Sequence, residues 1–205
     1  MIARQLSFRS LQAALLASLL TLSISASISA KPGQDNKVPT VKIKNFGQMD
    51  DRFYRGAQPT AEDIKDLAAL GIKTIIDLRD DPKEYEKREA ESLGMQYVNI
   101  PMSDSKYPKQ ESVEEFLKLI NDQATGKFYV HCAGGRHRTG VIGAVYRYNL
   151  YGWNYDQVYK EMKDFDFYTR FGHGAMKDYV QDYWQQVQAG TIHVSAGEHV
   201  STSNH

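Results

Sequence analysis

The chain has 205 residues, in which 25 Lys and Arg balance 25 Asp and Glu, and 41% of the residues are hydrophobic. This length and hydrophobic content suit one folded domain, and the even charge excludes the broad basic surface of a non-specific nucleic-acid-binding protein. A single cysteine excludes an intrachain disulfide framework and a cysteine-rich zinc site.

Residues 1–30 have the three parts of a secretory signal peptide. Arg4 and Arg9 precede an apolar run at residues 11–22, and small residues follow up to Ala30. The apolar run is shorter than the roughly 20 residues that a membrane span needs. An uncleaved anchor or a buried helix is the alternative. We expect cleavage after Ala30, with Ala26 as the competing site, and export to the periplasm or the cell exterior. Without the two arginines the chain is slightly acidic, so we expect no stable membrane association.

Beyond a polar lead-in at residues 31–50, the sequence alternates between β-branched stretches and helical ones. Thr60 is a good helix N-cap with Asp63 three positions later, and Gly71 is suited to end that helix. Residues 139–150 are apolar almost all round the helix axis, which predicts a central buried helix. The expected strands are residues 41–46, 53–55, 74–78, 96–100 and 128–131. The expected helices are residues 60–71, 82–94, 111–123, 139–150, 154–163 and 174–187.

Strands that alternate with helices form largely parallel sheets that are covered on both faces. We therefore expect an α/β fold, with a central and mostly parallel sheet flanked by helices, over residues 51–187. Residues 188–205 are polar and lack periodicity, and they are expected to form a disordered tail.

The stretch between the last strand and the central helix holds the only cysteine and reads His131, Cys132, Ala133, Gly134, Gly135, Arg136, His137, Arg138, Thr139 and Gly140. A loop that ends at a helix N-terminus turns unpaired N–H groups and the positive end of the helix dipole inward, which favours an oxyanion. The same field favours a thiolate, the reactive form of Cys132. Arg138 can bind two oxygens at once, and Thr139 can offer its hydroxyl to the sulfur. These residues predict phosphoryl transfer through a phosphocysteine.

This pattern of His-Cys, five residues, Arg and Thr-Gly resembles the signature of the cysteine-based protein tyrosine and dual-specificity phosphatases. Upstream, residues 54–59 (Tyr-Arg-Gly-Ala-Gln-Pro) and 76–79 (Ile-Asp-Leu-Arg) are similar to the small atypical dual-specificity group of plants, fungi and bacteria. The resemblance spans about residues 53–162 and implies a protein tyrosine phosphatase-like fold.

The resemblance implies Cys132 as nucleophile, Arg138 as phosphate clamp and His131 as an orienting neighbour of the cysteine. Thr139 would assist hydrolysis of the phosphocysteine. Asp104, which follows a strand, would be the general acid that protonates the leaving oxygen and later activates water. The tryptophan that precedes this aspartate in larger tyrosine phosphatases is absent. The implied phosphate-binding loop consists of Ala133, Gly134, Gly135, Arg136, His137 and Arg138.

Asp80 and Asp81 are the alternatives to Asp104 as the general acid. We expect no cofactor and no metal, and a phosphorylated protein or small molecule as partner rather than nucleic acid. The leading hypothesis is a phosphoprotein phosphatase of tyrosine or dual specificity. Arg136 and His137 add positive charge, so an inositol polyphosphate or pyrophosphate phosphatase is the first alternative.

Two other classes of protein remain as alternatives. One is a non-catalytic module that only binds phosphate, although every residue with a chemical role is present. The other is a rhodanese-like sulfurtransferase, which also has a cysteine in a strand-to-helix loop; the ending Arg138-Thr139-Gly140 argues against it.

Overall fold

The computed structural model describes residues 41–192, so the expected leader, residues 31–40 of the lead-in and the tail from residue 193 lie outside the described part. The strands are β1 (Gly47–Gln48), β2 (Phe53–Ala57), β3 (Thr74–Asp77), β4 (Gln96–Asn99) and β5 (Phe128–Cys132). The helices are α1 (Ala61–Ala69), α2 (Glu84–Ser92), α3 (Gln110–Asn121), the short 3-10 helix η1 (Gln123–Thr125), α4 (His137–Tyr151), α5 (Tyr155–Asp164) and α6 (Gly174–Gln188). None of the helices in this part is long and apolar enough to cross a membrane.

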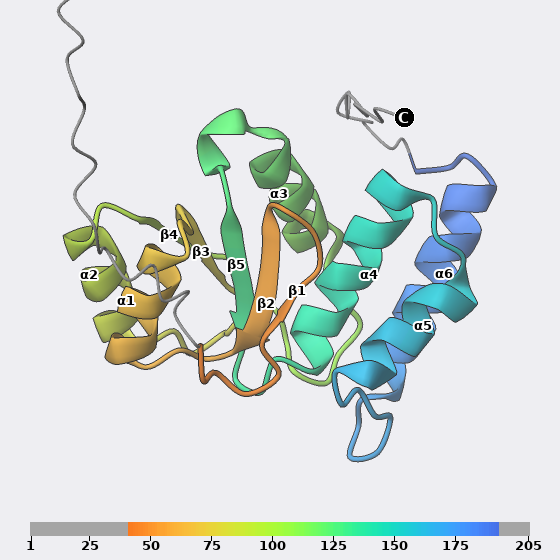
Figure 1. Cartoon of the computed structure of the whole chain (residues 1–205). Coiled ribbons are helices and arrows are strands. Elements are labelled where there is room, and N and C mark those ends of the chain that lie inside the picture. The colour runs from red at the N-terminus through yellow and green to blue at the C-terminus, as the bar shows by residue number, and fades with distance from the viewer. Residues whose placement is uncertain (1–40, 193–205) are drawn as a thin grey trace, which may run out of the picture. The chain divides into compact units, whose positions relative to one another are not determined.

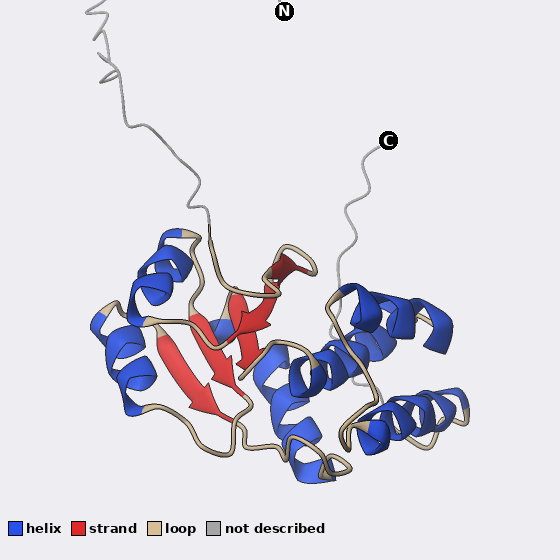
Figure 2. Ribbon diagram, turned by 90° about the horizontal axis from the view of Figure 1, so that it is seen from below, coloured by secondary structure: helices blue, strands red, loops and turns tan. Residues whose placement is uncertain are grey.

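The expected mostly parallel sheet is confirmed. Its strand order is β1-β2-β5-β3-β4, in which only β1 runs antiparallel to its neighbour. Helices α1 and α2 lie on one side of the sheet, and α3 to α6 lie on the other (Figure 1; Figure 2). Ala57 pairs with Cys132, and Asp77 pairs with His131. The carboxyl ends of β2, β5 and β3 therefore meet at one edge, where α/β proteins place their binding sites.

The strand expected at residues 41–46 is wrong. The chain turns at Asn45, whose φ of 53° lies in the left-handed region, and β1 begins only afterwards. Ile43 and Met49 are buried, and β1 pairs with β2. The lead-in boundary at residue 50 is thus too late, because residues 43–49 contribute side chains and a strand to the folded domain.

Helix α4 confirms the expectation of a central buried helix, and it begins earlier than expected. Its residues 138–149 are all buried. It packs against β5 and α3, and α5 and α6 pack against it in turn (Figure 1). Apolar residues all round the axis follow from these neighbours, and the helix N-terminus is fixed beside the end of β5.

Capping residues at the starts of α1 and α5 explain why local sequence signals predict where these helices begin. Thr60 accepts a hydrogen bond from the Asp63 amide, and the Asp63 carboxylate accepts one from the Thr60 amide, which completes a capping box at α1. Asn154 and Gln157 form the same reciprocal pair at α5. These local bonds fix where both helices begin.

Candidate active site

Hydrogen bonds from neighbouring residues to its carbonyl groups hold the loop between β5 and α4 in place. Cys132 ends β5, and Arg136 is the N-cap of α4. Three successive loop carbonyls accept hydrogen bonds: Ala133 O from the Gln58 amide at 3.4 Å, Gly134 O from Asn45 Nδ2 at 2.8 Å and Gly135 O from Arg55 Nη2 at 2.8 Å. In a trans peptide the N–H points opposite to the C=O. Binding the carbonyls on the outside therefore turns the loop amides inward, as an oxyanion site requires.

Gly135 is the position where this loop requires a glycine. Its φ is 67°, and a Cβ there would overlap the backbone of Gly56 in β2. A Cβ on Gly56 would in turn overlap the hydroxyl of Tyr129. The glycine at position 135 lets the loop lie directly against β2, and the glycine at position 56 leaves room for the Tyr129 side chain.

The Cys132 thiol is buried at the centre of this loop, with 4% of the residue exposed. Burial alone would raise its pKa. The Thr139 hydroxyl and amide, the charge of Arg138 and the Gly134 amide oppose that effect and leave the pKa of Cys132 below its usual value. The buried Thr139 hydroxyl makes no hydrogen bond of standard geometry in the described residues, so it is free to turn toward the sulfur. The arrangement favours a thiolate, as the sequence predicts.

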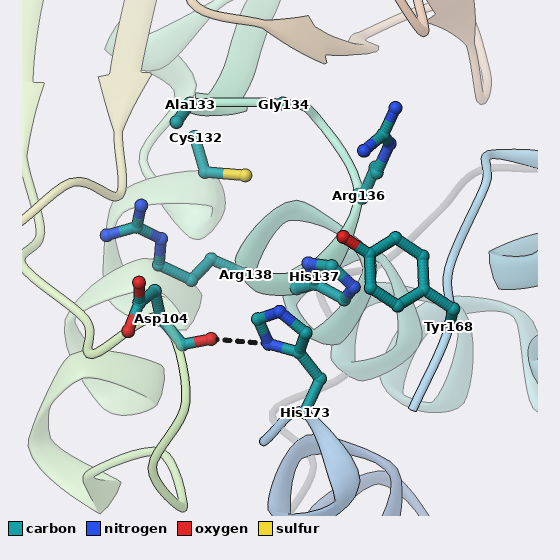
Figure 3. Close-up of a pocket in the computed structure, with 9 residues that line it drawn as sticks. All are labelled: Asp104, Cys132, Ala133, Gly134, Arg136, His137, Arg138, Tyr168 and His173. Atoms are coloured by element: carbon teal, nitrogen blue, oxygen red, sulfur yellow. Dashed lines mark hydrogen bonds between the residues drawn. The ribbon is translucent and has the colours of Figure 1, made fainter. Parts of the chain in front are cut away.

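Arg138 lies in the first turn of α4 and is almost fully buried, with 6% exposed. Its Nη1 donates to Asp80 Oδ1 at 2.9 Å and to the Met102 carbonyl at 3.1 Å, and its side chain lines the same pocket as Cys132 (Figure 3). Asp80 thus orients the arginine. Asp81 pairs with Arg79 instead, so each alternative acid already has a cationic partner.

Asp104 lies in the pocket with Cys132, whereas His131 lies behind the pocket. Asp104 is exposed in the loop between β4 and α3, and it lines the pocket with Cys132 (Figure 3). His131 is fully buried, and its Nε2 lies 3.0 Å from Glu86 Oε2 while its Nδ1 lies 3.8 Å from Asp77 Oδ1. Successive strand residues point to opposite faces of a sheet. The His131 ring therefore faces α2, behind the pocket rather than inside it.

The pocket has a volume of about 200 Å³. The residues that line it are Asp104, Cys132, Ala133, Gly134, Arg136, His137, Arg138, Tyr168 and His173 (Figure 3). Tyr168 and His173 come from the segment between α5 and α6, and the sequence alone predicts no role for either. No spacing relates that segment to the Cys132 loop, so only the fold brings them together.

The positive charge that Arg136 and His137 bring to the pocket is smaller than predicted. Burial, and then the neighbouring His173, lower the pKa of His137 to about 4, so this imidazole is neutral at pH 7. Arg136 lies with its Nε 3.7 Å from Asp166 Oδ2. The pocket thus has one further guanidinium besides Arg138, and an acidic residue lies beside it.

The sequence alone does not distinguish Arg55 from an exposed cation, and the structure shows that it supports the Cys132 loop. It is 1% exposed in the middle of β2, donates to Gly135 O and stacks on Phe165 with its guanidinium carbon 4.0 Å from the ring centroid. Burial lowers the pKa of Arg55 to about 10, against the opposing charges of Glu161 and Cys132, so it remains a cation at pH 7. An arginine inside a buried strand beside a glycine is the signal that could have identified it.

One buried cluster in residues 41–192 could hold a metal ion. Asp77, Glu86 and His131 each offer one ligand atom, and these atoms lie within 4.8 Å of one another. The cluster lies behind the loop, on the α2 side. The expectation that the protein uses no metal stays a prediction.

A family model matches residues 38–180, and its description is a DSP-PTPase phosphatase fused to NAD+ kinase. The probable tyrosine-protein phosphatase DG1060 of Dictyostelium discoideum is 30% identical over 126 residues, which are 59% of this chain and 75% of that protein. The inositol diphosphatase DSP2 of Oryza sativa subsp. japonica is 28% identical over 147 residues, 69% of this chain and 72% of that protein.

A solved structure shows the same fold. The core catalytic domain of the PP-IP phosphatase SIW14 from S. cerevisiae superposes with a TM-score of 0.58 at 19% identity, over 73% of this chain and 93% of that one. The protein tyrosine phosphatase-like fold that the resemblance implies is therefore confirmed.

Proposed function

The chain belongs to the DSP-PTPase phosphatase family and is a phosphatase, and from this premise we propose that it hydrolyses phosphate monoesters on proteins through a phosphocysteine at Cys132. One observation carries the proposal: the buried Cys132 thiol lies at the centre of a loop whose amides face inward, beside the Arg138 guanidinium. Such a site binds the equatorial oxygens of a phosphoryl group where charge spreads in the transition state.

In the first step the Cys132 thiolate attacks phosphorus, an S–P bond forms and the P–O bond to the leaving group breaks. Asp104, as a carboxylic acid, gives its proton to the leaving oxygen. In the second step the Asp104 carboxylate accepts a proton from water, whose oxygen attacks phosphorus. The S–P bond breaks, the Thr139 hydroxyl donates a hydrogen bond to the departing thiolate, and inorganic phosphate leaves.

The proposed substrates are proteins that carry phosphate on tyrosine, or on tyrosine and on serine or threonine. The charge of the pocket supports this choice over highly phosphorylated ligands, because His137 is neutral and Arg136 lies beside Asp166. The rice relative, an inositol diphosphatase by name, favours a second candidate, an inositol polyphosphate or pyrophosphate substrate.

Turnover of phosphotyrosine peptides and of inositol pyrophosphates, compared by kcat/KM for the same reduced preparation, tests the substrate. We expect the peptides to be preferred, and a large advantage for the inositol pyrophosphates would replace the leading proposal with the second. Cys132→Ser should abolish both activities. A folded, reduced protein that hydrolyses no phosphate ester at all would instead indicate a module that only binds phosphate.

We also propose that residues 1–30 are a cleaved leader and that the mature protein acts outside the cytoplasm. The basic start, the apolar run and the small residues up to Ala30 support it. Cell fractionation followed by N-terminal sequencing is the test. A start at Lys31 in the exported fraction would support export, and the uncleaved chain in the cytoplasm would contradict it.

A further inference from the structure

The segment between α5 and α6 turns sharply before it reaches the pocket. In residues 41–192 the non-glycine residues with positive φ are Asn45, Asp166 and Phe171, and two of them lie in this segment. Phe171 has a φ of 58° although it is 83% exposed, and Gly172 follows with a φ of 90°. A strained backbone conformation costs free energy, and the exposed Phe171 side chain does not offset that cost. Such strain clusters at sites where the structure holds a neighbouring group in a defined place. The group placed here is His173.

The ring of His173 is fixed by its neighbours on two sides. It stacks on His137, with centroids 3.6 Å apart and planes at 12°, and the edge of Tyr168 packs against it at 5.5 Å. Tyr168 also packs against His137, at 4.4 Å. Because His137 is the first residue of α4, the ring of His173 is held against the helix that carries Arg138.

His173 Nδ1 lies 2.8 Å from the carbonyl oxygen of Asp104 (Figure 3). A carbonyl oxygen can only accept, so Nδ1 carries the hydrogen. This bond joins the loop after β4 to the start of α6. Tyr107, in the same loop, donates to Asp182 of α6 at 2.9 Å. The two hydrogen bonds therefore attach the loop between β4 and α3 to α6 and to its N-cap, His173.

We propose that His173 is a positioning residue for Asp104, and this inference rests on the proposed role of Asp104 as general acid. The bond from Nδ1 fixes the peptide group that carries the Asp104 side chain, which restricts where its carboxyl can lie. Asp104 itself is exposed, and its carboxylate accepts no hydrogen bond in the described residues. Without the bond, the carboxyl spends less time where it can reach the leaving oxygen, and proton transfer becomes slower.

Two substitutions separate the hydrogen bond of His173 from its stacking. His173→Phe keeps an aromatic ring against His137 and loses the donor, whereas His173→Asn keeps an amide N–H near the position of Nδ1 and loses the ring. The measurement is kcat/KM, which reports the phosphoryl transfer to Cys132, for phenyl phosphate and for para-nitrophenyl phosphate. Proton donation matters more for phenyl phosphate, because phenoxide is the poorer leaving group.

We expect His173→Phe to lower kcat/KM about tenfold for phenyl phosphate and clearly less for para-nitrophenyl phosphate. His173→Asn should restore most of the loss. Tyr107→Phe, which removes the other bond between the loop and α6, is the matched control and should change the ratio of the two substrates less. Thermal unfolding of each variant verifies that it folds.

Asp104→Asn distinguishes failure of this inference from failure of the role proposed for Asp104. If Asp104→Asn leaves the difference between the two substrates unchanged, Asp104 is not the acid, and the inference about His173 falls with that role, whereas the proposed phosphocysteine at Cys132 is tested separately by Cys132→Ser. If it slows phenyl phosphate selectively while His173→Phe does not, only the role of His173 is overturned. In the Asp104→Asn background His173→Phe should have no further effect. An equal loss for both substrates would also overturn positioning, because it would mean that His173 contacts the phosphate.

Discussion

The Nε2 atom of His131 lies 3.0 Å from Oε2 of Glu86, and both residues are fully buried. Asp77 Oδ1 lies on the other side of the ring, 3.8 Å from Nδ1. The residue before the cysteine is thus held between two carboxylates, one at the end of β3 and one in α2. Burying charged groups costs free energy unless each has a partner, so the three residues depend on one another.

Glu86→Gln should destabilise the fold, because it removes one charge from this buried group. We expect the free energy of unfolding to fall by about 3 kcal/mol. Glu91→Gln, in the same helix but exposed, is the control and should change it by less than about 0.5 kcal/mol. Urea denaturation of both variants measures the difference. Equal stability of the two variants would show that the His131 and Glu86 contact contributes nothing.

Arg55→Met should reduce catalysis without removing any residue from the pocket wall. Methionine keeps much of the apolar contact with Phe165 but cannot bind Gly135 O, so the inward-facing amides are less well fixed. We expect kcat/KM to fall about a hundredfold for good and poor leaving groups alike, and inhibition by inorganic phosphate to weaken.

The control for this variant is Arg52→Met. Arg52 also donates to backbone carbonyls, those of Gly126 and Ile120, but at the other end of the strands. Arg52→Met should lower the free energy of unfolding and leave inhibition by inorganic phosphate unchanged. If both variants affected phosphate inhibition to the same degree, the role assigned to Arg55 would be wrong.

The sequence predicted the order of the elements well where local signals were strong. The Thr60 capping box and the nearly continuous apolar surface of helix α4 are examples, since each depends on residues close together in the chain. The strand expected at residues 41–46 failed because Asn45 adopts a left-handed turn there. Its side chain donates to Gly134 O, a contact across the fold that no local pattern contains.

The candidate site was predictable in part for the same reason. Cys132, Arg138 and Thr139 lie within one short stretch whose chemistry can be read directly. Arg55 and His173 reach that stretch only through the sheet and through the segment before α6. The charge of His137 was overestimated, because burial and a neighbouring histidine cannot be read from the sequence.

Thr139→Val should raise the pKa of Cys132 and slow release of the phosphate from it. The hydroxyl helps to lower that pKa, against the effect of burial, so its loss shifts the onset of thiolate formation to higher pH. The pH dependence of alkylation by iodoacetamide measures this shift. A hydrogen bond to a charged group contributes about 1.5–3 kcal/mol, so hydrolysis of the phosphocysteine should slow about ten- to hundredfold.

Thr74→Val is the control, because this buried hydroxyl donates to Thr125 O at the opposite end of the sheet. It should leave the alkylation profile of Cys132 unchanged. A Thr139→Val profile that coincides with the wild-type profile would show that the hydroxyl does not stabilise the thiolate.

Removal of metal ions should leave the activity and the thermal stability of the enzyme unchanged. The proposed steps use only side chains and amides of this chain, so treatment with a chelator should alter neither kcat/KM nor the melting temperature. A fall in either, reversed by added Zn²⁺, would contradict this and would direct attention to Asp77, Glu86 and His131.

The covalent intermediate tests the central claim most directly. Wild-type protein and Thr139→Val are mixed with para-nitrophenyl phosphate, quenched in acid during turnover and digested, and the peptides are analysed by mass spectrometry. The account predicts one added phosphoryl group on the peptide that contains Cys132, more of it in Thr139→Val, and none in Cys132→Ser. Steady turnover with no phosphoryl group on Cys132, or with the group on another residue, would contradict it.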